Sequence, residues 1–183
     1  MNTVIIDDEA SVRNSIKTLL TENFPDINIL CTAGSVEEGF SAVSHHKPDL
    51  VFLDIEMPDG TGFDLLKRFS DITFKVIFVT GHQEYALNAI KVSALDYILK
   101  PVDNDELLKA VKKAREIINQ EEQHLKFQAL NENLQSKKVL KRIILHTADQ
   151  LQLVSVSDII RAEADSNYTF FRLSDGKKVL VSR

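Results

Sequence analysis

The sequence has few of the features that would place it among disulfide-rich, secreted or membrane proteins. It contains one cysteine, Cys31, so no disulfide can form within the chain. Because Cys31 lies in the apolar run INILCTA, we expect a buried thiol in a reducing compartment. No apolar run approaches the roughly 20 residues of a membrane-spanning helix. The amino-terminal MNTVIIDDEA lacks the basic segment of a signal peptide and is acidic by Asp7. These absences favour a cytoplasmic protein with no membrane segment.

Charge is distributed unevenly along the 183 residues. Residues 1–119 carry 12 Lys and Arg against 19 Asp and Glu, a net charge of −7. Residues 120–183 carry 10 against 8, a net charge of +2. An acidic first part and a mildly basic second part predict two units with different partners.

Residues 1–119 alternate short apolar runs with segments of helical periodicity, beginning with a strand. The apolar runs predict strands over 3–7, 27–31, 49–54, 75–80 and 94–99. Helices are predicted over 11–21, from Ser35, over 62–69, over 84–92 and from Asp103. Ser35 and Glu38 have the spacing of a capping box at a helix start. This alternation is typical of an α/β fold, a doubly wound parallel sheet with helices on both faces.

The last of these helices is predicted to continue into a linker, residues 120–137. The stretch EIINQEEQHLKFQALNENLQSKK contains neither proline nor glycine and many helix-forming residues. Its apolar spacing is interrupted, because a heptad pattern ends before Glu121 and resumes in a shifted phase at Phe127. Two interpretations stay open, a helix that pairs with a second copy and a solvated spacer helix.

Residues 138–183 change to a period of two, which is typical of strands. The strand candidates VLKRIILH, LQLVSV, IIRAEA, YTFFRL and KVLVS are separated by turns at TADQ, DSN and SDG. We therefore expect a partial all-β segment. Since it is short and stops within a strand pattern, we expect a truncated domain with an unpaired strand edge.

Polar side chains follow the predicted strands at one and the same edge of the sheet. Asp7 and Asp8 end the first strand, Asp54 the third and Thr80 the fourth, while Lys100 follows the fifth. In an open parallel sheet the carboxyl ends of the strands form the ligand-binding crevice. Three carboxylates there need a compensating cation, which Lys100 and a divalent ion such as Mg²⁺ can supply. This arrangement favours attack of a carboxylate on a phosphoryl group.

Each of these residues also has an ordinary interpretation. Asp54 alone suits a strand-end cap, and Asp7 and Asp8 suit caps of the first helix. Thr80 suits an ordinary strand end, and Lys100 an ordinary surface lysine. The coincidence at four strand ends is what favours a functional site.

These residues and their spacing resemble the receiver domain of bacterial two-component response regulators over the whole of residues 1–119. The motifs that carry the resemblance are DD at 7–8, LDIEMPDGTG at 53–62, VTG at 79–81 and DYILKP at 96–101. The resemblance implies a flavodoxin-like (βα)5 fold with a parallel five-stranded sheet and an extended last helix.

By this resemblance Asp54 is the phosphoacceptor and Mg²⁺ is the cofactor. The metal ligands would be Asp8, Asp54 and the main-chain carbonyl of Glu56, while Asp7 would help to hold the ion through water. The loop 58–62, rich in proline and glycine, would bring the backbone close to the metal.

The same resemblance assigns the switch residues. Thr80 would be the switch hydroxyl, Lys100 would pair with the phosphoryl group, and Tyr97 would turn inward when Thr80 moves. The peptide bond after Lys100 is expected to be cis, as in most relatives. Glu56 and His82 occupy positions that tune hydrolysis of the phosphoryl group in this family, and they are also candidates for plain rim residues.

Residues 138–183 are similar to the first half of a LytTR-type DNA-binding domain. The signature is DIIRAEA followed by NYT. Asn167 and Tyr168, expected in a loop that could approach DNA, are the candidate DNA contacts, although a turn residue and a core aromatic are equally good interpretations. The net charge of 137–183, with 9 basic and 5 acidic residues, is consistent with phosphate contact. Because half of such a domain is missing, we expect this chain to bind promoter DNA weakly or not at all.

The implied function is a cytoplasmic, phosphorylation-activated response regulator with a sensor histidine kinase as its partner. It would catalyse only its own phosphorylation and dephosphorylation, and so would not be a turnover enzyme. Phosphorylation is expected to pair two copies through the fourth helix, fifth strand and fifth helix, and to control transcription through the LytTR-type unit.

Two alternatives stay open. An aspartyl-phosphate phosphohydrolase also uses aspartate and Mg²⁺, but its nucleophile usually follows the first strand, whereas Asp54 follows the third. A receiver that signals without phosphorylation is the other alternative, and the complete set of site residues argues against it.

Overall fold

The computed structural model describes residues 1–135, 140–147, 151–165 and 168–182. The chain divides into two compact units, Met1–Glu116 and Ile117–Arg183, and one helix runs through the division. Within the described residues no helix is long and apolar enough to cross a membrane.

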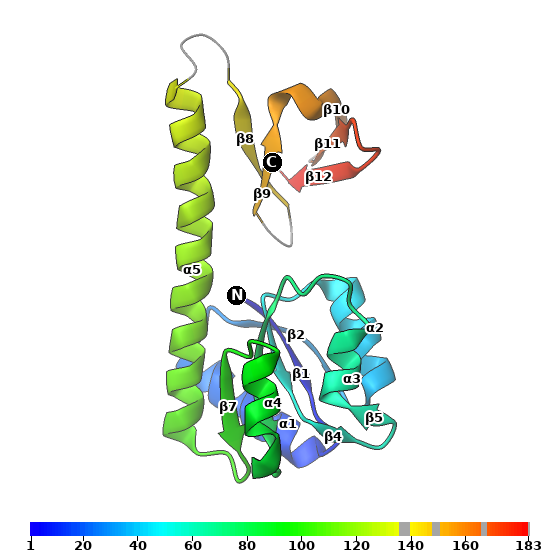
Figure 1. Cartoon of the computed structure of the whole chain (residues 1–183), viewed down its shortest axis with the longest axis vertical. Coiled ribbons are helices and arrows are strands. Elements are labelled where there is room, and N and C mark those ends of the chain that lie inside the picture. Colours follow the sequence, from blue (N-terminus) through cyan, green and yellow to red (C-terminus); the bar gives the residue numbers. More distant parts are fainter. Residues whose placement is uncertain (136–139, 148–150, 166–167, 183) are drawn as a thin grey trace. The chain divides into compact units, whose positions relative to one another are not determined.

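The first unit is built on a five-stranded parallel sheet with the order β2-β1-β3-β6-β7 (Figure 1). Its strands are β1 (Asn2–Ile6), β2 (Asn28–Ala33), β3 (Leu50–Leu53), β6 (Lys75–Thr80) and β7 (Asp96–Leu99). A short hairpin of β4 (Glu56–Met57) and β5 (Gly60–Thr61) follows β3. The chain adds β2 on one side of β1 and then crosses over to add β3, β6 and β7 on the other side. This reversal of direction is that of a flavodoxin-like doubly wound fold. The predicted fold class is confirmed.

The helices cover both faces of this sheet and form two separate cores. They are α1 (Ala10–Asn23), α2 (Val36–His46), α3 (Gly62–Lys67), α4 (Ala86–Lys91) and α5 (Asn104–Gln135), with a 3₁₀ turn, η1 (Gln83–Tyr85), before α4. On one face Ile16 and Leu20 of α1 and Leu107 of α5 pack against the sheet. On the other face α2, α3 and α4 do so, for example through Val43 and Leu65. Burial on both faces explains why the strand sequences are almost continuously apolar.

The capping of the helix starts agrees only in part with the prediction from the sequence. Ser35 accepts a hydrogen bond from the amide of Glu38 at 3.2 Å, as predicted. The Glu38 carboxylate, however, accepts from the amide of Gly34 at 2.8 Å, so the predicted reciprocal box is only half formed. A complete capping box instead opens α3, between Thr61 and Asp64. Glu38 is long enough to reach one residue beyond the cap, which sequence spacing does not reveal.

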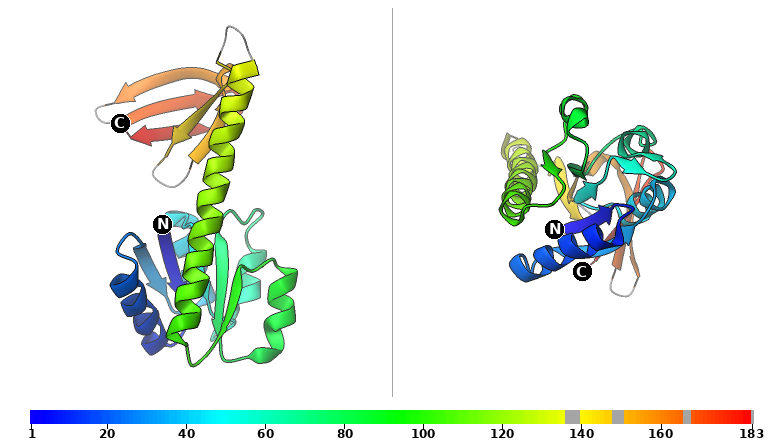
Figure 2. Two further views of the ribbon diagram at one scale, coloured as in Figure 1. Left: turned by 90° about the vertical axis from the view of Figure 1, so that its left-hand side faces the viewer. Right: turned by 90° about the horizontal axis from the view of Figure 1, so that it is seen from below.

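After the helix, the described residues of the second unit form short antiparallel strands and one 3₁₀ turn. Strands β8 (Arg142–His146) and β9 (Leu151–Ser155) form a pair, and β10 (Ile159–Asp165), β11 (Tyr168–Leu173) and β12 (Lys178–Ser182) form a three-stranded sheet (Figure 2). A 3₁₀ turn, η2 (Val156–Asp158), links β9 to β10. The core of this unit consists of four buried residues among those described, Leu145, Val154, Leu173 and Val179. The predicted all-β segment is confirmed.

Two expectations about single residues were wrong. Cys31 is a free thiol but is only partly buried, because β2 is an edge strand of the sheet. Partial burial still raises the pKa of this thiol above its ordinary value. Tyr168 lies in a strand and not in a loop, since it begins β11 and pairs with Asp165 and Ser182.

Candidate functional site

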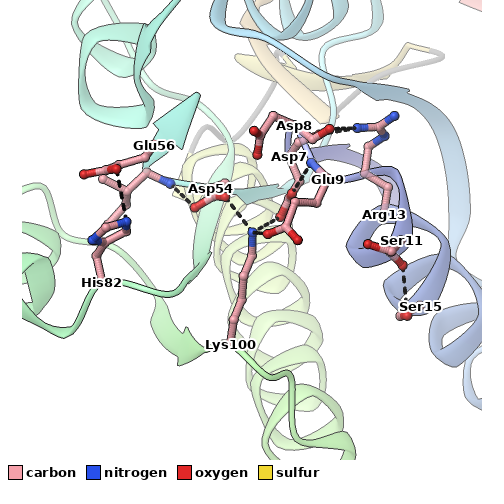
Figure 3. Close-up of polar contacts among 11 residues, drawn as sticks. Asp7, Asp8, Glu9, Ser11, Arg13, Ser15, Asp54, Glu56, His82 and Lys100 are labelled. Carbon is pink, nitrogen blue, oxygen red and sulfur yellow. Dashed lines mark hydrogen bonds and ion pairs between the residues drawn. The ribbon is translucent and has the colours of Figure 1, made fainter. Parts of the chain in front are cut away.

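The predicted acidic residues and Lys100 converge at the carboxyl edge of the first sheet (Figure 3). Asp7 and Asp8 follow β1, Asp54 follows β3, Thr80 ends β6 and Lys100 follows β7. Asp7 and Asp54 are buried, with 1% and 5% of their surface exposed, while Asp8 is exposed. The carboxyl ends of the parallel strands share one edge of the sheet. Groups that are up to 93 positions apart in the sequence, from 7 to 100, are thereby brought together.

The ammonium group of Lys100 lies among three carboxylates of the site. Its Nζ atom lies 2.7 Å from Oδ2 of Asp54, 2.9 Å from Oδ2 of Asp7 and 2.9 Å from Oε1 of Glu9. The side chain is only 14% exposed, so the interpretation as an ordinary surface lysine is wrong. The peptide bond between Lys100 and Pro101 is cis, as expected.

Burial and ion pairing act in opposite directions on the charged groups. Desolvation raises the pKa of Asp7 to about 6, even though Lys100 and the amide of Glu9 favour its ionised form. Desolvation alone would lower the pKa of Lys100, but hydrogen bonds to Asp54, Glu9 and Asp7 outweigh it and raise that pKa. The ammonium therefore stays charged, while Asp7 is poised to lose or gain its proton near neutral pH.

The acceptor candidate Asp54 is held rigidly by backbone contacts. Its Oδ1 atom accepts a hydrogen bond from the amide of Ile55 at 2.6 Å, which leaves Oδ2 facing Lys100. Gly62 packs directly on this residue, because a Cβ at position 62 would lie 2.4 Å from the main-chain oxygen of Asp54. The amide of Gly62 donates to the carbonyl of Ile55 at 2.8 Å. The loop 58–62 is thus folded back against the end of β3.

The acidic residues of the edge fit a hard divalent cation. Carboxylate oxygens of Asp7, Asp8, Glu9 and Asp54 all lie within 4.8 Å of one another. Oδ2 of Asp7 is buried, and its one partner among the described residues is the ammonium of Lys100, 2.9 Å away. A cluster of carboxylate oxygens is the kind of ligand set that Mg²⁺ takes.

Asp7 and Asp8 do not cap α1. The N-cap of that helix is Glu9, and it makes no side-chain cap hydrogen bond. Asp7 instead accepts from the amide of Glu9 at 2.8 Å. The interpretation of the pair as helix caps is therefore wrong.

The switch candidates lie on the two strands that continue the sheet beyond β3: Thr80 ends β6, which pairs with β3, and Tyr97 lies in β7, which pairs with β6. Thr80 is fully buried, and its Oγ1 has no hydrogen-bond partner among the described residues. Tyr97 is half-buried, and its hydroxyl donates a hydrogen bond to the main-chain carbonyl of His82. The Tyr97 ring also contacts Phe78 of β6, with ring centroids 6.3 Å apart. A buried hydroxyl with no partner among the described residues costs free energy.

Glu56 and His82 are joined at the rim of the site. Nε2 of His82 lies 3.1 Å from Oε2 of Glu56, and its Nδ1 lies 3.2 Å from Oε1 of Glu84. The hydroxyl of Tyr85 donates to Oε1 of Glu56 at 3.3 Å. Hydrogen bonds and ion pairs thus link four residues, which we call the rim cluster: Glu56, His82, Glu84 and Tyr85.

Two residues of the site escaped the sequence analysis. Glu9 is part of the acidic group and pairs with Lys100, which lies 91 positions away. Arg13 donates from Nη1 to the main-chain oxygens of Asp7 and Asp8 and so fixes the loop after β1. The run of three acids, DDE at 7–9, is the sequence feature that points to Glu9 as a member of the acidic group. Arg13 reaches the site because it lies in the first turn of α1.

The DNA-contact candidates are only partly described. Asn167 lies outside the described residues. Tyr168 is 48% exposed, so the alternative of a core aromatic is wrong for this residue. The second unit thus presents one of the two candidate side chains to solvent.

Comparisons with known proteins agree with this geometry. The response regulator receiver domain family matches residues 3–112. A sensory transduction protein LytT from Bacillus anthracis is 30% identical over 163 residues, which are 87% of this chain and 64% of that protein. The LytT protein of Enterococcus faecalis is 32% identical over 87% of this chain and 63% of its own length. The chain thus spans less than two thirds of these relatives.

Solved structures show the same fold. The receiver domain of AraT, a response regulator from Geobacillus stearothermophilus, superimposes with a TM-score of 0.61 and 32% identity. It covers 66% of this chain and 96% of that domain. The match of the family over most of the first unit, the topology of its sheet and the relatives together lead to one conclusion. The chain is a response regulator of the two-component receiver family.

Proposed function

We propose that Asp54 accepts a phosphoryl group from a sensor histidine kinase and that the first unit is a phosphorylation-dependent switch. One observation carries the proposal. Oδ2 of Asp54 lies 2.7 Å from the ammonium of Lys100 within the acidic group, and the hydroxyl of Thr80, at the end of the neighbouring strand β6, has no partner among the described residues.

The proposed chemistry is transfer of a phosphoryl group to a carboxylate. Oδ2 of Asp54 forms the new bond to phosphorus, while the bond from phosphorus to the donor's imidazole nitrogen breaks and that nitrogen keeps the electron pair. Bound Mg²⁺ would neutralise charge on the transferring oxygens. Asp8, Asp54 and the carbonyl of Glu56 are its proposed ligands, with Asp7 acting through water.

Lys100 and Thr80 have separate tasks in this proposal. The ammonium of Lys100 already lies where charge develops, so it needs only to turn from Asp54 to a phosphoryl oxygen. Thr80 would donate its hydroxyl to another of those oxygens. The half-buried Tyr97 would then leave the carbonyl of His82 and turn inward, which changes the surface of α4, β7 and α5.

That surface is the proposed contact between two phosphorylated copies. Leu87 and Ile90 of α4 are 71% and 72% exposed, and Leu99 of β7 is 37% exposed. Large apolar side chains gathered on one face are typical of an interaction surface.

We further propose that the second unit belongs to a LytTR-type module that carries the output to promoter DNA in the cytoplasm, and that this chain by itself binds such DNA weakly or not at all. The support is the similarity to LytT proteins over 87% of the chain and the excess of basic residues over 137–183. DNA binding would be measured by fluorescence anisotropy at several salt concentrations, since phosphate contacts weaken as salt rises. Binding that does not depend on salt would contradict this part of the proposal.

The phosphoacceptor is tested by intact mass spectrometry. The chain is incubated with Mg²⁺ and acetyl phosphate, as wild type, as Asp54→Asn and as Asp71→Asn, an exposed control. We expect one phosphoryl group on the wild type and on Asp71→Asn, and none on Asp54→Asn. We expect chelation of the metal to abolish labelling.

The alternatives give different outcomes in the same experiment. Steady release of phosphate from the donor, without a labelled protein, would indicate a phosphohydrolase. Absence of both label and release would indicate a receiver that signals without phosphorylation. Label on Asp54→Asn would place the acceptor elsewhere.

A further inference from the structure

A groove between α3 and α4 is not used by the proposed phosphoryl chemistry. It has a volume of about 690 Å³. This volume lies in the range of pre-formed small-molecule sites, roughly 300–1,000 Å³. Its apolar lining comes from Phe63 and Leu66 of α3, Ile72 of the next loop, Tyr85 of η1 and Val92 after α4.

The floor of the groove is packed and its rim is open. Leu66 is 4% exposed, and the ring of Phe63 contacts the rings of Phe78 and Tyr85 at centroid distances of 5.0 and 6.1 Å. Ile72 and Val92 are 42% and 40% exposed, so they leave apolar surface in contact with water. A ligand with an apolar body would remove that surface from water.

The charges at the rim favour an anion. Lys67 is paired with Asp64 at 2.8 Å, and Asp64 is further satisfied by the capping box of α3. Lys91, by contrast, has no carboxylate within 4.0 Å among the described residues. The groove thus combines an apolar floor with a cation at its edge, Lys91, that has no ionic partner in the described part of the chain.

We propose that the α3–α4 groove binds a small amphiphilic carboxylate, with its apolar chain against Phe63 and Leu66 and its carboxylate at Lys91. The volume fits a small molecule, and the charge selects an acid over an alcohol or an amine.

The groove is connected to the rim cluster through one hydroxyl. Tyr85 lines the groove and donates to Oε1 of Glu56, whose Oε2 lies 3.1 Å from His82. Glu56 follows Asp54 by two residues. A ligand that moves the Tyr85 ring therefore moves the Glu56 carboxylate beside the acceptor. This coupling rests on the proposed function, whereas ligand binding does not.

Binding is tested by calorimetric titration of the full chain with octanoate, and with octanol and octylammonium as neutral and cationic analogues. We expect octanoate to bind most tightly. Lys91→Gln should weaken octanoate about two- to fivefold, the range of a partly exposed ion pair, and should leave octanol unchanged. Lys17→Gln, an exposed lysine of α1, is the matched control and should bind like the wild type.

A second variant blocks the groove by volume. Asn88 lines the groove from the exposed side of α4, so Asn88→Trp should fill it and weaken octanoate at least about tenfold. Circular dichroism checks that this variant is folded. Octanoate binding that survives in Asn88→Trp, or equal binding of octylammonium, would overturn the proposed site.

Coupling is tested by the lifetime of the phosphorylated protein. Octanoate should change that lifetime in the wild type but not in Tyr85→Phe, which keeps the ring and loses the hydroxyl. An unchanged lifetime in octanoate-bound wild type would overturn the coupling. A protein that takes no phosphoryl group but still binds octanoate would instead refute the proposed function and leave the site standing.

Discussion

The two units of the chain differ in how much apolar surface they bury. The first unit has two cores of 15 and 13 buried residues, one on each face of its sheet. The second has a single core of four among the described residues. A large core can hold buried charges such as Asp7 and Asp54 in fixed positions, because the packed strands around them do not yield. The proposed chemistry therefore lies in the unit whose core can offset the free-energy cost of burying these charges.

The largest expected effect on stability comes from substitutions that destabilise one core at a time. Phe52→Ala removes a ring that is 1% exposed and should destabilise the first unit by about 3–5 kcal/mol. Leu173→Ala should open the second unit while the amides of the first stay protected. Hydrogen exchange measured by mass spectrometry reports the protection of the amides in each unit separately. Loss of protection in both units from Leu173→Ala would show that the cores are not independent.

The buried acid of the first unit makes its stability depend on pH. The pKa of Asp7 is about 6 in the folded protein against 3.8 for an ordinary aspartate, so the folded state holds the proton more tightly. This stabilisation is complete below pH 3.8 and is lost as the pH rises to about 6. In EDTA, Asp7→Asn should be more stable than wild type above pH 6, by at most about 3 kcal/mol.

Urea unfolding at several pH values measures this difference. The gap between wild type and Asp7→Asn should close towards pH 4, and Asp71→Asn should show no such trend. A gap that is the same at all pH values would show that Asp7 does not hold its proton in the folded state. Added Mg²⁺ should stabilise the wild type more than Asp7→Asn, since only the folded state binds it.

The contact between the loop 58–62 and Asp54 is tested by adding one methyl group. Gly62→Ala would place a Cβ 2.4 Å from the main-chain oxygen of Asp54 and should cost about 1–3 kcal/mol by overpacking. Gly81→Ala is the control, because its Cβ would meet nothing within 4 Å, and it should change stability by less than about 0.5 kcal/mol. Equal effects would contradict the close approach.

The smallest expected effect on stability is at the exposed apolar face of α4. Leu87→Ser and Ile90→Ser should each change the free energy of unfolding by less than about 0.5 kcal/mol, because these side chains are more than two thirds exposed. In the phosphorylated protein the same changes should reduce dimer formation, which light scattering measures. A dimer that persists in the double variant would exclude this face.

The sequence by itself determined the order of strands and helices and the edge at which the acids gather. Apolar periodicity is a local property of the chain, and the carboxyl ends of parallel strands necessarily meet at one edge. For that reason the sequence alone predicts that five residues share one edge: Asp7, Asp8, Asp54, Thr80 and Lys100. The helical linker and the change to antiparallel strands after residue 138 followed from the same local patterns.

Only the tertiary structure decided which side chains pair. Lys100 divides its ammonium among Asp54, Asp7 and Glu9, and Glu38 prefers the amide of Gly34 to that of the cap. Tyr85 joins the groove to Glu56 across 29 positions. Such pairings depend on competition between partners that approach within a few ångströms when separate elements pack. Local periodicity contains no information about that competition, so the sequence located the site and the fold arranged its contacts.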